Sequence, residues 1–285
     1  MVLGTAQFGM DYGIANLSGK PSKMEGFKIL DLAWEKGVRS FDTAPGYGSE
    51  ALLGEFISAN GLREEAKVLT KIHPLEGESD YKKSIMTTLE SSLNNLGCPV
   101  DVLFFHNPAD SGLLLKDPQF FEKLQRDNQV SNLGVSVYET QEVEHLSGCP
   151  FELAFQFPFN VLDRRFEQTS MPKGKRYARS VFLQGLLASA KGLRPDAPEE
   201  LLKLQEAYHS KLVEHSVSPV ELALSYAANS DCVDYFLVGV ESKQQLMDIM
   251  NRESDISQDS TFLQPLLSNI SEKWLDPREW NGALK

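Results

Sequence analysis

The sequence predicts a single-domain α/β fold, the (β/α)8 or TIM barrel, over residues 1–285. Three observations indicate it: eight short runs rich in apolar and β-branched residues, segments with helical spacing between most of them, and no Gly/Ser-rich linker. Near-continuous apolar strands that alternate with helices are typical of a parallel sheet covered on its outer face. The predicted strands are MVLGTA, VRSFDTA, KVLTKI, VDVLFFH, VSNLGVSV, FELAFQF, ARSVFL and VDYFLVGV.

Local signals predict where three of the outer helices begin. Ser22 opens an S-x-x-E capping box ahead of an apolar stripe, and Gly37 predicts the end of that helix. Ser218 opens a second box with proline in the first helical turn, and Ser242 opens an S-x-x-Q version directly after the last strand. The segment 183–200 is the longest predicted loop.

Composition and charge exclude several classes of protein. Lys plus Arg is 28 and Asp plus Glu is 40, and the net charge of −12 disfavours nucleic acid and anionic membrane as partners. No apolar run approaches the roughly 18 residues of a membrane span, and the N-terminal stretch has no signal-peptide pattern. Cys98, Cys149 and Cys232 lie far apart, and the histidines show no metal-ligand spacing. We therefore expect a cytoplasmic protein without a metal; its oligomeric state is not predicted.

Titratable side chains stand at the ends of the predicted strands. In this fold the C-terminal ends of the strands meet at the face that carries active sites. Strand two ends at Asp42, its following loop brings Tyr47, strand three ends near Lys71, and strand four ends at His106. The sequence therefore predicts one site built from these four residues.

The four residue types suit proton donation to a substrate oxygen. A tyrosine ordinarily has a pKa of about 10, and an ammonium at about 4 Å contributes roughly 4 kcal/mol at an effective dielectric of about 20. Lys71 is therefore expected to lower the pKa of Tyr47, and Asp42 to keep Lys71 charged and oriented. His106 is expected to donate a hydrogen bond to a substrate oxygen.

This set of four, in these contexts, resembles the catalytic tetrad of the aldo-keto reductase family. The resemblance extends over nearly the whole chain, with each motif in the expected order. It is carried by GTAQFG (4–9), DTAPGYG (42–48), GVSVY (134–138), FQFPFNVLDRR (155–165), FLQGLL (182–187) and GVESKQQL (239–246).

The resemblance implies an NAD(P)H-dependent oxidoreductase that reduces a small carbonyl substrate. Tyr47 would be the general acid, Lys71 and Asp42 its tuning pair, and His106 the group that orients the carbonyl. The implied cofactor-binding residues are Gly4, Thr5, Ala6, Ser136, Gln156, Phe182, Leu183, Gly185, Gly239, Glu241, Ser242, Lys243 and Gln245.

The chain departs from the family pattern at three places. Val137 stands where the family usually has Asn, and the aromatic residue that commonly stacks on the nicotinamide has no clear counterpart, with Phe182 or Arg179 as substitutes. The family habit implies NADPH. Glu241 precedes Ser242 where relatives often have a basic residue for the 2′-phosphate, so NAD stays open; an acid there can accept from a ribose hydroxyl, and Lys243 would offset it.

The substrate and two alternative functions stay open at this point. Asn107 follows His106 where many relatives have an aromatic residue, which favours a hydroxylated or sugar-like carbonyl compound. One alternative is an aldolase or isomerase that forms a Schiff base on Lys71. The other is a nicotinamide-binding regulatory subunit without catalytic activity.

Overall fold

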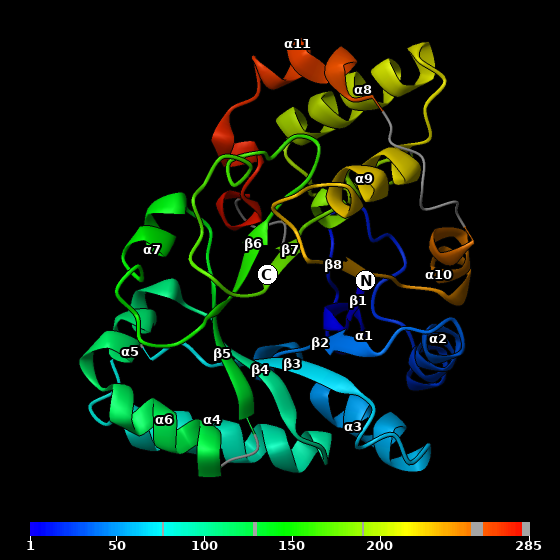
Figure 1. Cartoon of the computed structure of the whole chain (residues 1–285). Helices are drawn as coiled ribbons and strands as arrows, with labels where there is room; N and C mark the ends of the chain where they lie inside the picture. Colours follow the sequence, from blue (N-terminus) through cyan, green and yellow to red (C-terminus); the bar gives the residue numbers. More distant parts are fainter. Residues whose placement is uncertain (76, 128–129, 190, 252–258, 281–285) are drawn as a thin grey trace.

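The computed structural model describes residues 1–285 except 76, 128–129, 190, 252–258 and 281–285. Eight parallel strands pair in chain order, and β8 pairs with β1 to close a barrel (Figure 1). This confirms the predicted (β/α)8 barrel. The strands are β1 (Val2–Gly4), β2 (Ser40–Asp42), β3 (Lys67–Ile72), β4 (Val100–Phe105), β5 (Val130–Ser136), β6 (Ala154–Pro158), β7 (Arg176–Arg179) and β8 (Tyr235–Gly239).

Helices surround the barrel, and α2, α3 and α4 pack side by side with α10 against α2. The three predicted helix starts are confirmed: Ser22, Ser218 and Ser242 each accept a backbone N–H from the residue three positions on. The α-helices are α1 (Ala6–Gly9), α2 (Lys23–Glu35), α3 (Glu50–Ala59), α4 (Tyr81–Leu96), α5 (Leu113–Lys116), α6 (Pro118–Asp127), α7 (Thr140–Glu144), α8 (Glu199–Glu214), α9 (Pro219–Ala228), α10 (Lys243–Met250) and α11 (Gln264–Leu267).

The strands separate two apolar layers. Side chains on one face of each strand join the large core beneath the helices, among them Leu3, Phe41, Leu103 and Phe155. Side chains on the other face fill the barrel interior; they are Val2, Leu69, Val102, Phe104, Ala154 and Tyr177, with Tyr235 and Leu237 against them. Because side chains alternate along a strand, the next inward position of each strand lies above this interior layer, at the C-terminal rim.

The seventh strand is shorter than the predicted run ARSVFL. β7 ends at Arg179 because Ser180 takes a positive φ of 58°, a backbone region that ends strand pairing. A 3-10 turn follows at Leu183–Gly185, where Gln184 also has a positive φ. The predicted long loop then continues to α8 at Glu199, as the sequence indicates.

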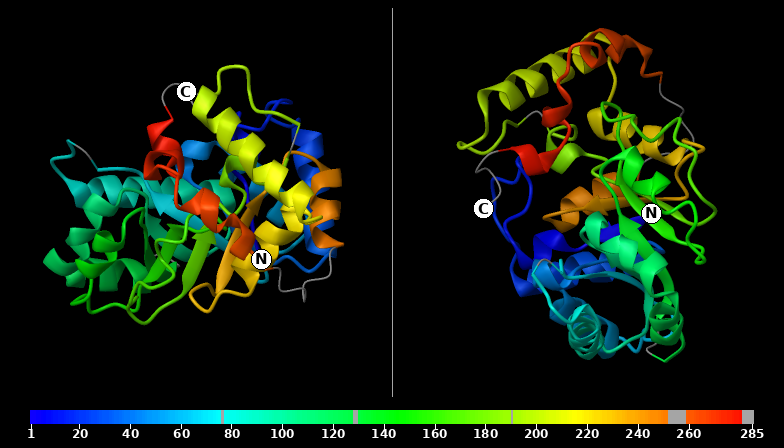
Figure 2. Two further views of the ribbon diagram at one scale, coloured as in Figure 1. Left: turned by 90° about the horizontal axis from the view of Figure 1, so that it is seen from above. Right: turned by 90° about the vertical axis from the view of Figure 1, so that its left-hand side faces the viewer.

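A third apolar cluster lies beside the barrel, where α8 packs with the C-terminal part of the chain (Figure 2). Tyr208 and Leu212 of α8 meet Leu263, Leu275 and Trp280 there. The other short 3-10 turns are Pro45–Tyr47 after β2, Pro108–Gly112 after β4, and Thr261–Leu263, Glu272–Trp274 and Pro277–Glu279 in the C-terminal part. Among the described helices, none is both long and apolar enough to cross a membrane.

Candidate active site

The uppermost inward positions of the eight strands form a ring of chemically distinct residues at the C-terminal rim. On six strands this residue follows an interior apolar residue of the same strand by two positions. On β2 and β5 it is the last residue that points inward. The ring consists of Gly4, Asp42, Lys71, His106, Ser136, Gln156, Arg179 and Gly239. Strand alternation therefore brings together residues that lie far apart in the sequence.

Asp42 and Lys71 form a buried ion pair in this ring. The side chains are 6% and 1% exposed, and the Lys71 Nζ lies 2.9 Å from both carboxylate oxygens of Asp42. The ammonium also donates to the Thr43 carbonyl at 2.9 Å, so it has an acceptor for each of its three hydrogens. Gln156 Nε2 donates to Asp42 Oδ1 at 2.7 Å. Burial is tolerated because each charge is paired and hydrogen-bonded.

The corner that carries Tyr47 is a 3-10 turn, Pro45–Tyr47, closed by Gly48 at φ 73°. Gly9 of α1 packs directly against it: a Cβ added to Gly9 would lie 1.7 Å from the Tyr47 carbonyl oxygen. The Tyr47 ring meets the His106 ring edge to face, with centroids 6.2 Å apart. Lys71 Nζ lies 4.9 Å from the Tyr47 ring centre. The turn thus holds the hydroxyl-bearing ring between the ion pair and His106.

The electrostatic effect on Tyr47 is opposite to the expected one. Burial raises the pKa of the Tyr47 hydroxyl well above its usual range, and the charge of Asp42 raises that pKa further. Arg179 is the cation that opposes this rise. The charge of Lys71 is matched by Asp42 in direct contact, so the pair brings little net positive charge to the phenol. The expectation that Lys71 lowers this pKa is wrong for the protein alone.

His106 is half-buried and neutral near pH 7. Burial lowers its pKa to about 4, and the positive charges of Lys71 and Arg179 add to the effect. A neutral imidazole carries one N–H donor and one acceptor nitrogen. His106 therefore retains a donor for a substrate oxygen without adding a charge to the ring.

A cavity of about 470 Å³ opens above the ring. Asp42 and Tyr47 line it, whereas Lys71 lies beneath Asp42 and His106 lies beside Tyr47 without being part of its lining. The sequence-predicted cofactor residues that line the cavity are Gly4, Ala6, Gln156, Phe182, Gly185, Gly239, Glu241 and Gln245. Most of the predicted cofactor positions therefore share one cavity with Asp42 and Tyr47.

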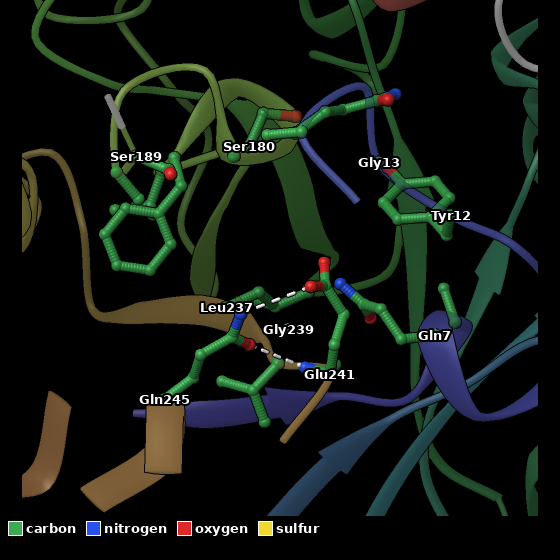
Figure 3. Close-up of a pocket in the computed structure, with 18 of the residues that line it drawn as sticks. Gln7, Tyr12, Gly13, Ser180, Ser189, Leu237, Gly239, Glu241 and Gln245 are labelled. Atoms are coloured by element: carbon green, nitrogen blue, oxygen red, sulfur yellow. Dashed lines mark hydrogen bonds between the residues drawn. The ribbon is translucent and has the colours of Figure 1, made fainter. Parts of the chain in front are cut away.

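Figure 3 shows the side of the cavity beyond β8. Glu241 and Gln245 are joined twice: the Glu241 N–H donates to Gln245 Oε1 at 2.8 Å, and Gln245 Nε2 donates to Glu241 Oε2 at 3.2 Å. Gln7 lies over Gly239, where an added Cβ would come within 2.3 Å of the Gln7 amide nitrogen. Gln7 and Tyr12 line the cavity too, and the sequence patterns gave no signal that places Gln7 there.

The other predicted cofactor residues do not line this cavity. Thr5 is fully buried, and its hydroxyl bonds the Asp42 carbonyl at 3.0 Å and Ser49 at 2.9 Å. Leu183 packs in the cluster beside α8. Ser242 caps α10, and the Lys243 N–H donates to Glu25 Oε1 at 3.4 Å. Ser136 is buried in the ring. None of these five residues therefore forms part of the cavity surface.

Replacing Lys71 by methionine is expected to destabilise the fold by about 3–5 kcal/mol, because it leaves the buried Asp42 carboxylate without its counter-charge. The matched control is the double variant Asp42→Asn/Lys71→Met, which removes both charges and should regain a large part of that free energy. Urea unfolding of the two variants and the wild type measures the difference. Equal stability of the single variant and the wild type would contradict a buried charged pair.

The His106 imidazole is expected to take up its proton near pH 4, below its ordinary pKa of 6.5. Between these two values the unfolded chain binds the proton and the folded chain does not, so acidification through this window should lower the free energy of unfolding. Nuclear magnetic resonance titration of labelled histidines, assigned with His106→Asn, measures the midpoint. A midpoint near 6.5 would contradict the burial argument.

Comparison with known proteins identifies the family of this chain. The model of the Aldo/keto reductase family matches residues 1–259. Aflatoxin B1 aldehyde reductase member 2 of Rattus norvegicus is 29% identical over 149 residues, which cover 48% of this chain and 41% of the rat protein. Norsolorinic acid reductase of Emericella nidulans is 25% identical over 279 residues, covering 86% of this chain and 72% of the fungal protein.

A solved structure shows the same fold. The glycerol dehydrogenase AKR11B4 from Gluconobacter oxydans superposes with a TM-score of 0.69 at 19% identity, covering 94% of this chain and 89% of that chain. Because the family model spans most of the chain, the assignment does not depend on the shorter matches. The chain belongs to the Aldo/keto reductase family.

Proposed function

We propose that the chain reduces an aldehyde or ketone to the corresponding alcohol, with Tyr47 as the proton donor. The grouping at the rim of the barrel carries the proposal: Tyr47 lines the cavity beside Asp42, and its ring lies against His106 and the Lys71 ammonium. The mouth of the cavity thus has a hydroxyl, a neutral imidazole and a paired ammonium beside it. Such a set suits a reaction in which negative charge develops on a substrate oxygen.

Tyr47 keeps its proton until the substrate oxygen becomes a strong base. Its hydroxyl makes no hydrogen bond to any described residue, so it is available to a substrate in the cavity. An alkoxide is a stronger base than a phenolate, so the raised pKa of Tyr47 still permits donation to the developing alkoxide. The positive charge of Arg179 stabilises the phenolate that remains.

His106 would hold the substrate oxygen beside this hydroxyl. Its pKa of about 4 leaves the imidazole neutral, so the N–H donates a hydrogen bond without acting as a competing acid. The edge-to-face contact holds the His106 ring directly beside the Tyr47 ring. Two donors directed at one oxygen orient the carbonyl and stabilise the charge it gains.

The residues of the cavity fit a nicotinamide cofactor, which when bound supplies the hydride. The lining extends from Asp42 and Tyr47 at one end to Glu241 and Asp248 at the other. Gly4 and Gly239 contribute no side chain to the cavity lining, and the Gln7 side chain lies over Gly239. Gln156 donates to Asp42 through its amide nitrogen, and its carbonyl oxygen would remain to accept from a carboxamide.

The acids at the outer end of the cavity favour NADH over NADPH, although the habit of the family favours NADPH. Glu241 and Asp248 line the cavity, and the carboxylate of Glu25 accepts from the first N–H of α10. A 2′-phosphate brought here would meet these negative charges, whereas ribose hydroxyls can donate to a carboxylate. Gln245 fixes the carboxylate of Glu241 in place.

The contacts of Lys71 and Asn107 give no support to a Schiff-base mechanism or to a sugar-like substrate. Lys71 is 1% exposed and has three acceptors, which does not support a Schiff base with a substrate carbonyl. Asn107 accepts from the Ala109 N–H through Oδ1 and caps the next turn, so it gives no support to a hydroxylated or sugar-like substrate.

The cytoplasmic location of the protein stays a prediction.

Replacing Tyr47 by phenylalanine is expected to lower the turnover number for carbonyl reduction by roughly 10²- to 10⁴-fold, because only the proton donor is lost. Folding and cofactor affinity should survive, since the hydroxyl bonds no described residue. Steady-state absorbance measures turnover, and fluorescence titration measures cofactor affinity separately. Turnover near the wild-type value with intact binding would show that Tyr47 is not the donor.

Replacing Glu241 by arginine is expected to shift cofactor preference toward NADPH by about tenfold or more, because a charge-assisted bond to phosphate contributes roughly 1.5–3 kcal/mol. Glu241→Gln is the matched control: it removes the repulsion without adding a cation and should give a smaller shift. The dissociation constants of NADH and NADPH, from fluorescence titration, measure both. Unchanged ratios in both variants would place Glu241 away from the adenosine ribose.

A further inference from the structure

Arg179 is a ring residue whose hydrogen-bond donors the proposed chemistry does not use. It is the last residue of β7, on the same face as Tyr177 of the barrel interior, so its side chain stands at the rim. It lines the cavity together with Asp42, Tyr47 and Gln156. Its positive charge opposes the rise in the pKa of Tyr47 and of Tyr12, which line the same cavity.

The guanidinium of Arg179 has donors to spare and no acid in contact. One terminal nitrogen donates to the Val137 carbonyl at 3.2 Å and the other to Ser180 Oγ at 3.4 Å. Three of its five N–H groups therefore make no hydrogen bond to any described residue. Among the described carboxylates, none forms an ion pair with it. A partly buried cation with free donors is a ready partner for an anion.

The charge of Arg179 is not balanced by the rest of this end of the cavity. Asp42 is occupied by Lys71, and His106 is neutral near pH 7. The nearby Asp276 is held by Arg278, with two nitrogens on its carboxylate at 3.0 and 2.5 Å. The lining acids Glu241 and Asp248 belong to the segment after β8 and to α10. The mouth around Tyr47 therefore carries a net positive charge.

Packing fixes the orientation of this cation. The Arg179 guanidinium carbon lies 3.9 Å from the centre of the Tyr138 ring, and that of Arg278 lies 3.3 Å from the same centre. Two guanidinium groups this close to one ring centre must occupy its opposite faces. The stack Arg179–Tyr138–Arg278 joins β7, the loop after β5 and the C-terminal segment, and a stacked guanidinium keeps its donors in the ring plane available.

We infer that Arg179 binds an anionic group of the substrate, so that the preferred substrates are aldehydes or ketones that also carry a carboxylate. This inference rests on the proposed reduction at Tyr47. The planar fork of a guanidinium matches a carboxylate with two parallel hydrogen bonds, which fixes direction as well as affinity. With its carboxylate on Arg179 and its carbonyl oxygen between Tyr47 and His106, the substrate is held at both ends.

The test compares pairs of substrates that differ in charge alone. Benzaldehydes with a carboxylate in the ortho, meta or para position are compared with the matching carboxamides in the wild type, Arg179→Met and Arg179→Lys. For at least one position the wild type should favour the carboxylate in kcat/KM by about tenfold or more, the range of a charge-assisted hydrogen bond. Arg179→Met should abolish this ratio, and Arg179→Lys should restore part of it.

Lys191→Met is the matched control, because Lys191 also lines the cavity but is exposed, and its loss should leave the ratio unchanged. Equal ratios in the wild type and Arg179→Met would overturn the inference while leaving carbonyl reduction intact. Weaker NADH binding by Arg179→Met with an unchanged ratio would assign the cation to the cofactor phosphates and also overturn it. Wild type inactive on both series would contradict the proposed reduction itself.

Discussion

The buried ion pair of Asp42 and Lys71 is the interaction on which the rest of this site depends. Two charges almost removed from water are stable because each oxygen of Asp42 and each hydrogen of Lys71 has a partner. The pair closes the floor of the cavity between β2 and β3 and ties Gln156 of β6 to it across the barrel. Tyr47 and His106 therefore lie beside an ion pair whose two charges offset each other.

This balance limits the effect of Lys71 on Tyr47. The ammonium lies beside the Tyr47 ring, but Asp42 offsets its charge, so it does not lower the pKa of the phenol. The net positive charge of the mouth comes instead from Arg179, on the opposite side of the ring, where the stack on Tyr138 holds it. Carboxylates gather at the far end, around Glu241 and α10. The cavity is therefore lined by the cation of Arg179 on β7 and by carboxylates after β8 and on α10, where we propose that the ribose of NADH binds.

The loop after β7 determines which residues line the cavity on that side of the barrel. Positive φ angles at Ser180, Leu183 and Gln184 turn the chain sharply, so that β7 stops at Arg179 instead of continuing through the apolar run VFL. Phe182 and Gly185 consequently line the cavity, while Leu183 packs beside α8. The barrel fold itself is shared with a solved structure at 19% identity.

The sequence by itself determined the eight strands, the three helix caps at Ser22, Ser218 and Ser242, and the four titratable residues at strand ends. These features depend on local spacing and on alternation along a strand, which residue order specifies directly. The tertiary structure alone decided which of them share a surface and what their charges do. Thr5 turns away into hydrogen bonds with Asp42 and Ser49, and the pKa of Tyr47 rises because burial and the charge of Asp42 outweigh the opposing charge of Arg179. The stack of Arg179, Tyr138 and Arg278 joins three distant segments, and burial and contacts across a barrel depend on how those segments pack in space.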